Sequence, residues 1–384
     1  MDRQQLRKLV ADMVAIPSVN PLDGPVVEGK GEAPLAQFVA SRLQEVGIDC
    51  ELLEALPGRP SVVARLPGES EEAVWFDAHL DTVAAEAMEF DPFAARIEGD
   101  ILYGRGAADD KASLAAMMAA LTEVANSGAK PPATIIFTAT ADEEYKMSGL
   151  SGLLESGLQA RAAIVGEPTG LEIVTAHKGV ARFTITTKGK AAHSSRPDEG
   201  LNAIYQMARV VTALEDYAKG GVGSETHPRL GRATLSVGVI RGGEYVNVIP
   251  DHCQIDVDRR LLPGEEPRRA VADVRTYLTS ALGGEVNMAV SGPSLMVPGL
   301  DLSASQPLVQ AASAALKQVI GRASLTGMTG TTHAGPLAEA GIPALVLGPG
   351  AMGQAHTSTE QLDLNQLEQA AAVYEALMRT GAAP

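Results

Sequence analysis

The chain has 384 residues and a formal net charge of −16, from 31 Lys and Arg against 47 Asp and Glu. Its 45% hydrophobic and 20% charged residues exclude a disordered chain, and its length predicts two domains, or one large domain with an insertion. The acidic balance argues against a nucleic-acid surface or an anionic membrane as partner, because both require clustered lysine and arginine.

The first part of the chain alternates amphipathic helices with short apolar runs. Apolar residues at helical spacing predict a helix from Leu6 to Val14, ended by Pro17, and a second helix over 33–46. The later elements are, in order, a strand over 73–78, a helix over 113–125, strands over 133–140 and 162–165, and a buried run over 343–348. Unbroken apolar runs between helices are typical of an α/β fold, with a mainly parallel sheet and helices on both faces.

The middle of the chain has a different pattern. In order, it predicts a strand over 180–189, a helix over 199–218, strands over 233–241 and 245–260, a helix over 266–282 and a strand over 285–290. This β-α-β-β-α-β order resembles the ferredoxin-like arrangement. We therefore expect an α/β domain made of residues 1–178 and 291–384, with an α+β domain inserted at 179–290.

Cysteine content and the N-terminal segment bear on the compartment. Cys50 and Cys253 are too few and too far apart for a disulfide framework or a cysteine zinc site, so we expect two reduced thiols. The first ten residues lack the continuous apolar core and cleavage site of a signal peptide. No run of about 18 apolar residues occurs, so we predict a cytoplasmic protein.

Acidic and histidine residues follow four of the predicted strands. His79 comes directly after the strand over 73–78, Glu143 and Glu144 follow the strand over 133–140, Glu167 follows 162–165, and His356 follows 343–348. Polar residues follow many strands simply because loops are polar. Here, however, four strands deliver such residues to the edge where open α/β sheets bind ligands, and Asp109 adds another carboxylate.

Two histidines with several carboxylates and no thiolate are a ligand set for Zn²⁺, Co²⁺ or Mn²⁺. A carboxylate can bridge two such ions about 3.5–4 Å apart, and the ion pair activates water and polarises a substrate carbonyl. A free carboxylate must still move the protons. Glu143 and Glu144 are adjacent, so one could bind metal while its neighbour serves as the base.

Eight segments together resemble the M20 metallopeptidases, in the order of that family. They are HLDTV (79–83), YGRGAADDK (103–111), ADEE (141–144), GEPT (166–169), AAHSSRP (191–197), NVIPD (247–251), RLLPGE (260–265) and AHTSTE (355–360). This family of di-zinc amidohydrolases includes acetylornithine deacetylase, succinyl-diaminopimelate desuccinylase, aminoacylases and glutamate carboxypeptidase. Each motif is modestly specific, but their conjunction covers nearly the whole chain.

The resemblance implies a role for each matching residue. One metal would be held by His79 and Glu167, the other by Glu144 and His356, with Asp109 as the bridge. Glu143 resembles the general base, and Asp81 resembles the carboxylate that fixes the tautomer of His79. His193 resembles a residue that reaches the partner subunit's active site, and Asn247 and Arg260 match substrate-binding positions. The family further implies that the inserted domain forms a homodimer and acts as a lid.

Some positions depart from the family. His333 stands where many members have Asp, so we expect altered substrate contacts or an altered pocket lining. Asp110 follows Asp109 where many relatives have Met, and the Ala-Asp-x-Lys pattern favours Asp109 as the bridge. Ser194 beside His193 could suggest a serine nucleophile, but no strand-turn-helix elbow surrounds it.

These residues predict a zinc-dependent amidohydrolase that removes the acyl group from an N-acyl amino acid, like acetylornithine deacetylase or succinyl-diaminopimelate desuccinylase. A dipeptidase or a glutamate carboxypeptidase-like exopeptidase is the alternative among enzymes. The alternative of another class is a non-catalytic dimeric binding protein, which a missing ligand or base would favour; none is missing.

Overall fold

The structure is a computed structural model that describes residues 1–22, 24, 26, 31–223 and 225–382. The chain divides into two units, the first made of Met1–Thr175, Leu302–Thr326 and Thr332–Pro384, the second of Ala176–Asp301 and Gly327–Thr331. The sequence places the insertion at 179–290, whereas the second unit reaches Asp301. The reason is that β16 (Met288–Val290) and β17 (Leu295–Val297) both pair with β9 (Gly179–Lys188).

The large sheet of the first unit is parallel in its middle and antiparallel at its edges. Its strands lie in the order β1-β2-β6-β3-β7-β20-β8, and β6, β3, β7 and β20 run parallel. The bounds are β1 (Asp49–Leu56), β2 (Arg59–Leu66), β3 (Ser70–His79), β6 (Ala133–Thr140), β7 (Ala162–Val165), β8 (Ile173–His177) and β20 (Ala344–Val346). Two short strands, β18 (Leu300–Asp301) and β19 (Leu325–Met328), pair with β8. The predicted α/β fold is confirmed, and the structure adds the antiparallel strands at the edges.

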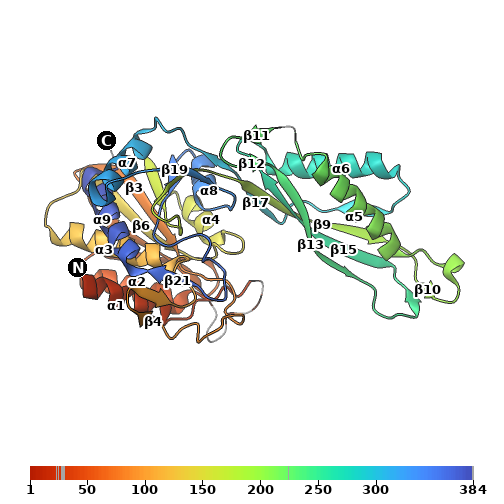
Figure 1. Ribbon diagram of the computed structural model, residues 1–384, viewed down its shortest axis with the longest axis horizontal. Coiled ribbons are helices and arrows are strands. Elements are labelled where there is room, and N and C mark those ends of the chain that lie inside the picture. Colours follow the sequence, from red (N-terminus) through yellow and green to blue (C-terminus); the bar gives the residue numbers. More distant parts are fainter. Residues whose placement is uncertain (23, 25, 27–30, 224, 383–384) are drawn as a thin grey trace. The chain divides into compact units, whose positions relative to one another are not determined.

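Helices cover both faces of this sheet (Figure 1). One face packs into a single core with α1 (Arg3–Val14), α2 (Ala33–Glu45), α3 (Lys111–Asn126), α7 (Pro307–Ile320) and α9 (Leu364–Thr380). The helices α4 (Ser148–Glu155) and α8 (Ala334–Glu339) lie outside that core. In β3, Val74, Phe76 and Ala78 belong to the core. Because side chains alternate along a strand, Asp77 and His79 point to the opposite face.

A small sheet connects the segment just before α9 with the segment that leads into the loop before α3. It has the order β21-β5-β4, with bounds β4 (Arg96–Glu98), β5 (Ile101–Tyr103) and β21 (Gln361–Asp363). Among the described residues, no helix combines the length and apolar character needed to cross a membrane. Both cysteines are free, Cys50 half-buried and Cys253 buried.

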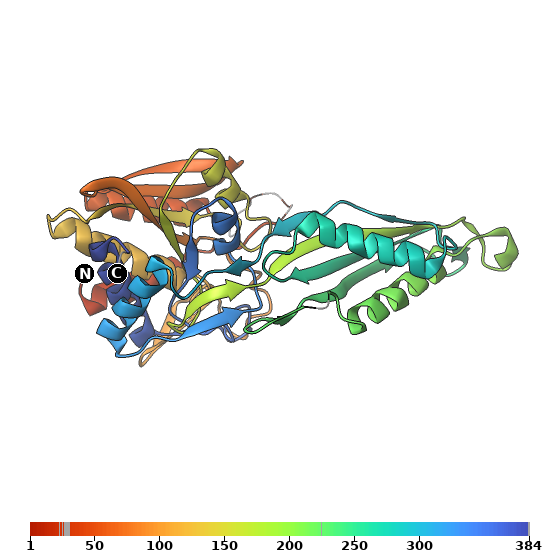
Figure 2. The ribbon, with the colours of Figure 1, turned by 90° about the horizontal axis from the view of Figure 1, so that it is seen from above.

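The second unit has the ferredoxin-like arrangement that its sequence predicts. Its antiparallel sheet has the order β13-β15-β9-β16, and α5 and α6 lie together on one face (Figure 2). The bounds are α5 (Ala203–Lys219), α6 (Pro267–Leu282), β13 (Thr234–Gly242) and β15 (His252–Leu261), with short strands β10 (Ala192–His193), β11 (Thr226–His227), β12 (Gly231–Arg232) and β14 (Val248–Ile249). The single strand predicted over 245–260 is wrong in its first part: residues 245–247 form no strand, β14 pairs with β10 in a separate sheet, and β15 begins only at His252. Pro250, between β14 and β15, has no N–H group to donate to a ladder.

Candidate metal centre

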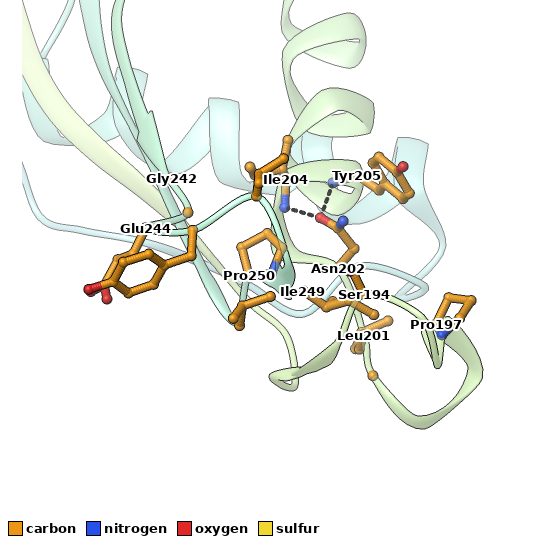
Figure 3. A pocket seen from close by; sticks show the side chains of 15 residues that line it. Ser194, Pro197, Leu201, Asn202, Ile204, Tyr205, Gly242, Glu244, Ile249 and Pro250 are labelled. Carbon is orange, nitrogen blue, oxygen red and sulfur yellow. Dashed lines mark hydrogen bonds between the residues drawn. The ribbon is translucent and has the colours of Figure 1, made fainter.

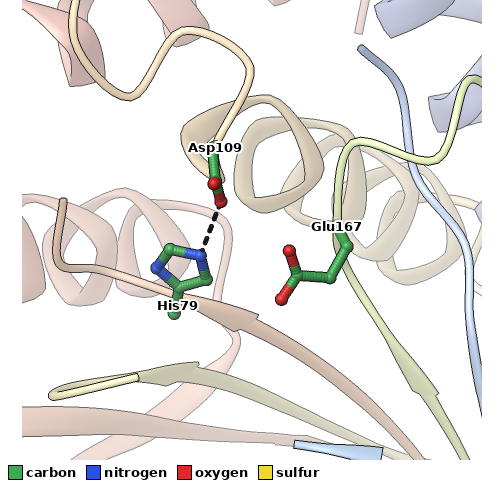
Figure 4. Close-up of side chains that lie close together, drawn as sticks. All are labelled: His79, Asp109 and Glu167. Carbon is green, nitrogen blue, oxygen red and sulfur yellow. Dashed lines mark hydrogen bonds and ion pairs between the residues drawn. The ribbon is translucent and has the colours of Figure 1, made fainter. Parts of the chain in front are cut away.

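Three potential metal ligands meet at the carboxyl end of β3. His79 is the last residue of that strand, Asp109 lies in the loop before α3, and Glu167 follows β7. One ligand atom from each residue lies within 4.8 Å of the others, and the His79 Nε2 and Asp109 Oδ1 atoms are 3.0 Å apart. Figure 4 shows these three side chains converging from separate segments.

A second group of ligands shares Asp109 with the first. It consists of Asp109, Glu144 and His356, whose ligand atoms also lie within 4.8 Å of one another. The His356 Nε2 atom is 3.1 Å from Glu144 Oε1 and 3.4 Å from Asp109 Oδ2. His356 has a positive φ of 62°. The structure thus brings together all five residues for which the sequence predicts metal binding, with Asp109 in the shared position.

The donors and their electrostatics fit divalent cations. Both groups offer imidazole nitrogens and carboxylate oxygens, the donors that zinc, cobalt and manganese accept. Burial, and after it the charge of Asp109, raises the pKa of both Glu144 and Glu167. Hydrogen bonds to Asp109 and Glu144 raise the pKa of His356 to about 10. Carboxylates crowded out of water repel one another, and cations between them would relieve that repulsion.

Glu143 lies beside the two groups but has a different environment. Its Oε1 atom is buried and has no hydrogen-bonding partner among the described residues. Burial raises the pKa of this carboxyl well above its usual value, although His79 opposes the shift. A buried carboxylate oxygen without a partner, next to potential metal ligands, is available to accept a proton from a water molecule.

Asp81 holds both adjacent glutamates by their backbone. Its Oδ1 atom accepts the N–H of Glu143 at 3.0 Å, and its Oδ2 atom accepts the N–H of Glu144 at 3.0 Å. The Asn20 side chain donates to Asp81 Oδ2 at 2.7 Å. The nearest partner of His79 Nδ1 is the backbone oxygen of Asp81, at 2.9 Å, whereas the Asp81 carboxylate lies 3.7 Å away. Both Asp81 groups thus lie near His79 Nδ1, the backbone oxygen closer than the carboxylate, and the role of that carboxylate in fixing the His79 tautomer stays a prediction.

The residues with predicted roles in substrate binding and oxyanion stabilisation lie in the second unit. His193 is exposed, and its Nδ1 atom is 2.8 Å from the Ser195 hydroxyl. The Ser194 N–H donates to the Asn247 backbone oxygen at 3.0 Å. His193 ends β10, and Asn247 directly precedes β14, the strand that pairs with β10. Arg260 is half-buried and donates from Nε to Asp258 Oδ1 at 2.7 Å.

His333 has a structural partner that the sequence analysis did not identify. Its Nδ1 atom lies 2.6 Å from Asp77 Oδ2, and both side chains are buried. The hydroxyls of Thr138 and Thr140 donate to the other oxygen of Asp77. In the sequence, Asp77 could have been noticed as a carboxylate inside an apolar strand, two residues before His79. Asn20, which donates to Asp81, has no comparable feature in its local sequence.

Comparison with known proteins agrees with this geometry. Residues 75–380 match the model of peptidase family M20/M25/M40. The acetylornithine deacetylase of Myxococcus xanthus is 32% identical over 353 residues, which cover 88% of this chain and 90% of that protein. The N-formyl-4-amino-5-aminomethyl-2-methylpyrimidine deformylase of Halalkalibacterium halodurans is 26% identical over 400 residues, covering 96% and 92%.

Among solved structures, the fold is similar to that of the M20 family metallo-carboxypeptidase Sso-CP2 from Sulfolobus solfataricus. The TM-score is 0.83 at 19% identity, with 100% of each chain covered. The chain therefore belongs to peptidase family M20/M25/M40, whose members are hydrolytic enzymes that use a dinuclear metal site.

Proposed function

We propose that this enzyme hydrolyses the amide bond of N-acyl amino acids and releases the free amino acid. One observation carries the proposal: Asp109 belongs to both groups of donors, and Glu143, the neighbour of Glu144 in the chain, has a buried oxygen without a partner among the described residues. This arrangement provides both a place for a pair of cations and a separate group that accepts a proton.

We propose zinc as the native metal: His79 and Glu167 would hold one ion, Glu144 and His356 would hold the other, and Asp109 would be the ligand that both ions share. When bound, two such ions lower the pKa of a water molecule and polarise the carbonyl that it attacks. The chain's own contribution is to keep the five donors at fixed positions at the edge of a rigid sheet.

Glu143 is proposed as the general base. Its carboxylate would accept the proton of the attacking water and then deliver it to the leaving nitrogen. Asp81 supports that role, because it bonds the backbone N–H groups of both Glu143 and Glu144 and so sets their relative orientation. One glutamate can then face the ions while its neighbour stays free to carry the proton.

The names of two relatives support the proposal that the enzyme removes an acyl group. One is named a deacetylase and one a deformylase, and both names describe the removal of a small acyl group from a nitrogen. The likeness to a carboxypeptidase is below 25% identity and concerns the fold alone. We therefore propose a deacylase, and an exopeptidase is an outcome that the substrate assay must distinguish.

We further propose that the second unit is a lid and forms a homodimer. Apolar side chains on its surface support this proposal, among them Tyr205, Ile240, Tyr245 and Val246, whose relative exposures range from 57% to 101%. Tyr205, Tyr245 and Val246 line the cavity of about 660 Å³ shown in Figure 3, which lies between the start of α5 and residues 242–250. Exposed apolar groups of this kind commonly mark protein interfaces.

In this proposal His193 acts on the oxyanion in the partner subunit's site, and Asn247 and Arg260 bind the substrate. The guanidinium of Arg260 suits a carboxylate, because it can donate two hydrogen bonds in one plane. The α-carboxylate of an amino-acid substrate is such a group.

The decisive experiment is to assay the zinc-loaded protein against N-acetylornithine, N-succinyl-diaminopimelate, other N-acyl amino acids and dipeptides. Three variants accompany it, with metal content measured for each. We expect Glu143→Gln to retain metal while kcat falls by about 10²–10⁴-fold, and His79→Ala and Asp109→Ala to lose metal. Glu51→Gln, at an exposed position of β1, is the matched control and should behave like the wild type.

Each outcome has a distinct meaning. Cleavage of dipeptides alone would replace the deacylase by an exopeptidase. Metal binding without hydrolysis of any substrate would favour the non-catalytic binding protein. Loss of metal from Glu143→Gln would show that the roles of Glu143 and Glu144 are exchanged.

A further inference from the structure

One buried carboxylate outside the two ligand groups contacts the loop that carries Asp109. Glu360 is 1% exposed, and its side chain accepts four hydrogen bonds. Its Oε2 atom accepts from Arg105 Nη1 at 2.7 Å and from the Gly106 N–H at 3.0 Å. Its Oε1 atom accepts the N–H groups of Ala108 at 2.9 Å and Asp109 at 3.0 Å.

The small sheet explains how Glu360 reaches this loop. Glu360 directly precedes β21, and β21 pairs antiparallel with β5, so that Gln361 lies opposite Tyr103. The ladder continues by one bond, because the Gly104 N–H donates to the Glu360 backbone oxygen at 3.3 Å. At that point β5 ends and the loop toward Asp109 begins. Glu360 also follows His356 by four residues, so one short segment both contacts the backbone of the shared ligand Asp109 and carries His356 of the second group.

The loop needs such an acceptor for a physical reason. Residues 105–109 are buried but form neither helix nor strand, so their N–H groups have few backbone acceptors. A single carboxylate satisfies three of these N–H groups, and Arg105 balances its charge. Hydrogen bonds to a charged acceptor are about twice as strong as neutral ones, so the loop backbone is tightly defined.

We propose that Glu360 is a positioning residue for the metal centre: it fixes the backbone of Asp109 so that the carboxylate of Asp109 can serve both ligand groups, and it anchors the segment that carries His356. Among the described residues, the four side-chain hydrogen bonds of Glu360 all go to residues 105–109, which is the pattern expected of a residue that supports one loop. This inference rests on the proposed metal site, and the experiment below separates the two.

The test uses Glu360→Gln, which keeps the size of the side chain. The amide places an NH₂ group against N–H donors, so one side of the arrangement must break. Zinc affinity of the metal-free protein is measured by competition with a chromophoric chelator, and the absorption spectrum is recorded for the cobalt-loaded protein. Outer partners of metal ligands are worth about 10–100-fold in metal affinity. We expect a loss of that size, larger for the second group because both Asp109 and His356 depend on Glu360, together with an altered cobalt spectrum.

Glu368→Gln is the matched control. Glu368 also accepts from arginines, at 2.5 Å from Arg3 Nε and 2.7 Å from Arg7 Nε, but it lies on α9 away from the loop. It should bind zinc within about twofold of the wild type and leave the cobalt spectrum unchanged. General destabilisation by a lost ion pair would not move that spectrum, so the spectrum separates positioning of the ligands from a purely structural role.

A second variant, Glu360→Asp, keeps the charge but shortens the reach, and we expect a smaller loss in the same direction. The inference is overturned if Glu360→Gln folds and binds both ions like the wild type. It is equally overturned if Glu360→Gln unfolds while Glu360→Asp folds with unchanged zinc affinity, or if neither variant folds, because Glu360 would then serve the fold as a whole. If the wild type itself binds no zinc, the proposed metal site fails first.

Discussion

Replacing His333 by alanine removes the nitrogen partner of a fully buried carboxylate. In the wild type His333 Nδ1 lies 2.6 Å from Asp77 Oδ2. Burial alone would raise the pKa of Asp77, but the His333 imidazole and the two threonine hydroxyls hold it below its usual value. Breaking a buried pair by removing one partner costs about 3–5 kcal/mol, so we expect His333→Ala to lower the free energy of unfolding by that amount.

The chain carries a reporter for this region. Trp75 is the single tryptophan, and its Nε1 donates to the Thr138 hydroxyl at 2.7 Å, the same hydroxyl that donates to Asp77. Urea unfolding of the metal-free protein, followed by tryptophan fluorescence, therefore measures the unit that contains the pair. The variant His333→Asn retains an N–H group near the position of Nδ1, and we expect it to cost only about 1–2 kcal/mol.

A double-mutant cycle with Asp77→Ala completes the test. If the two side chains stabilise the fold through each other, the double variant should be less destabilised than the sum of the single variants. Independent sites add within about 0.5 kcal/mol. The reasoning is refuted if His333→Ala costs less than about 1 kcal/mol, or if the cycle is additive within that limit.

Three further predictions concern other parts of the chain. Arg59→Met should lower the free energy of unfolding by about 3–5 kcal/mol in urea titrations. The reason is that Arg59 pairs with buried Glu32 at 2.5 Å and with buried Asp142 at 3.0 Å. A loss below about 1 kcal/mol would contradict this prediction. Burial lowers the pKa of His177 to about 4. As the pH falls, His177 therefore becomes protonated in the unfolded chain before it does so in the folded protein. Between pH 6.5 and 4 the free energy of unfolding should fall by about 3 kcal/mol on this account, a component that His177→Asn should lack in unfolding curves across that range. His193→Ala should lower kcat while its metal content stays that of the wild type. If this variant instead kept the kcat of the wild type, His193 would have no part in the mechanism.

The sequence by itself determined the elements whose signals are local. The strand predicted over 133–140 has the same bounds as β6, and the helix predicted over 113–125 lies within α3. The five potential ligands could also be predicted, because each follows a strand or stands in a family motif. Parallel neighbours bring the carboxyl ends of their strands to one edge, so a chain-order pattern already implies spatial proximity.

Tertiary structure alone decided how these side chains are held. The Asp81 carboxylate accepts the backbone N–H groups of Glu143 and Glu144, and His79 Nδ1 lies closer to the Asp81 backbone oxygen, at 2.9 Å, than to that carboxylate, at 3.7 Å. The partners Asp77–His333 and Glu360–Asp109 are 256 and 251 residues apart along the chain. Periodicity and capping signals act over a few residues, so they cannot specify contacts at such separations; only the packing of strands, loops and helices brings these groups together.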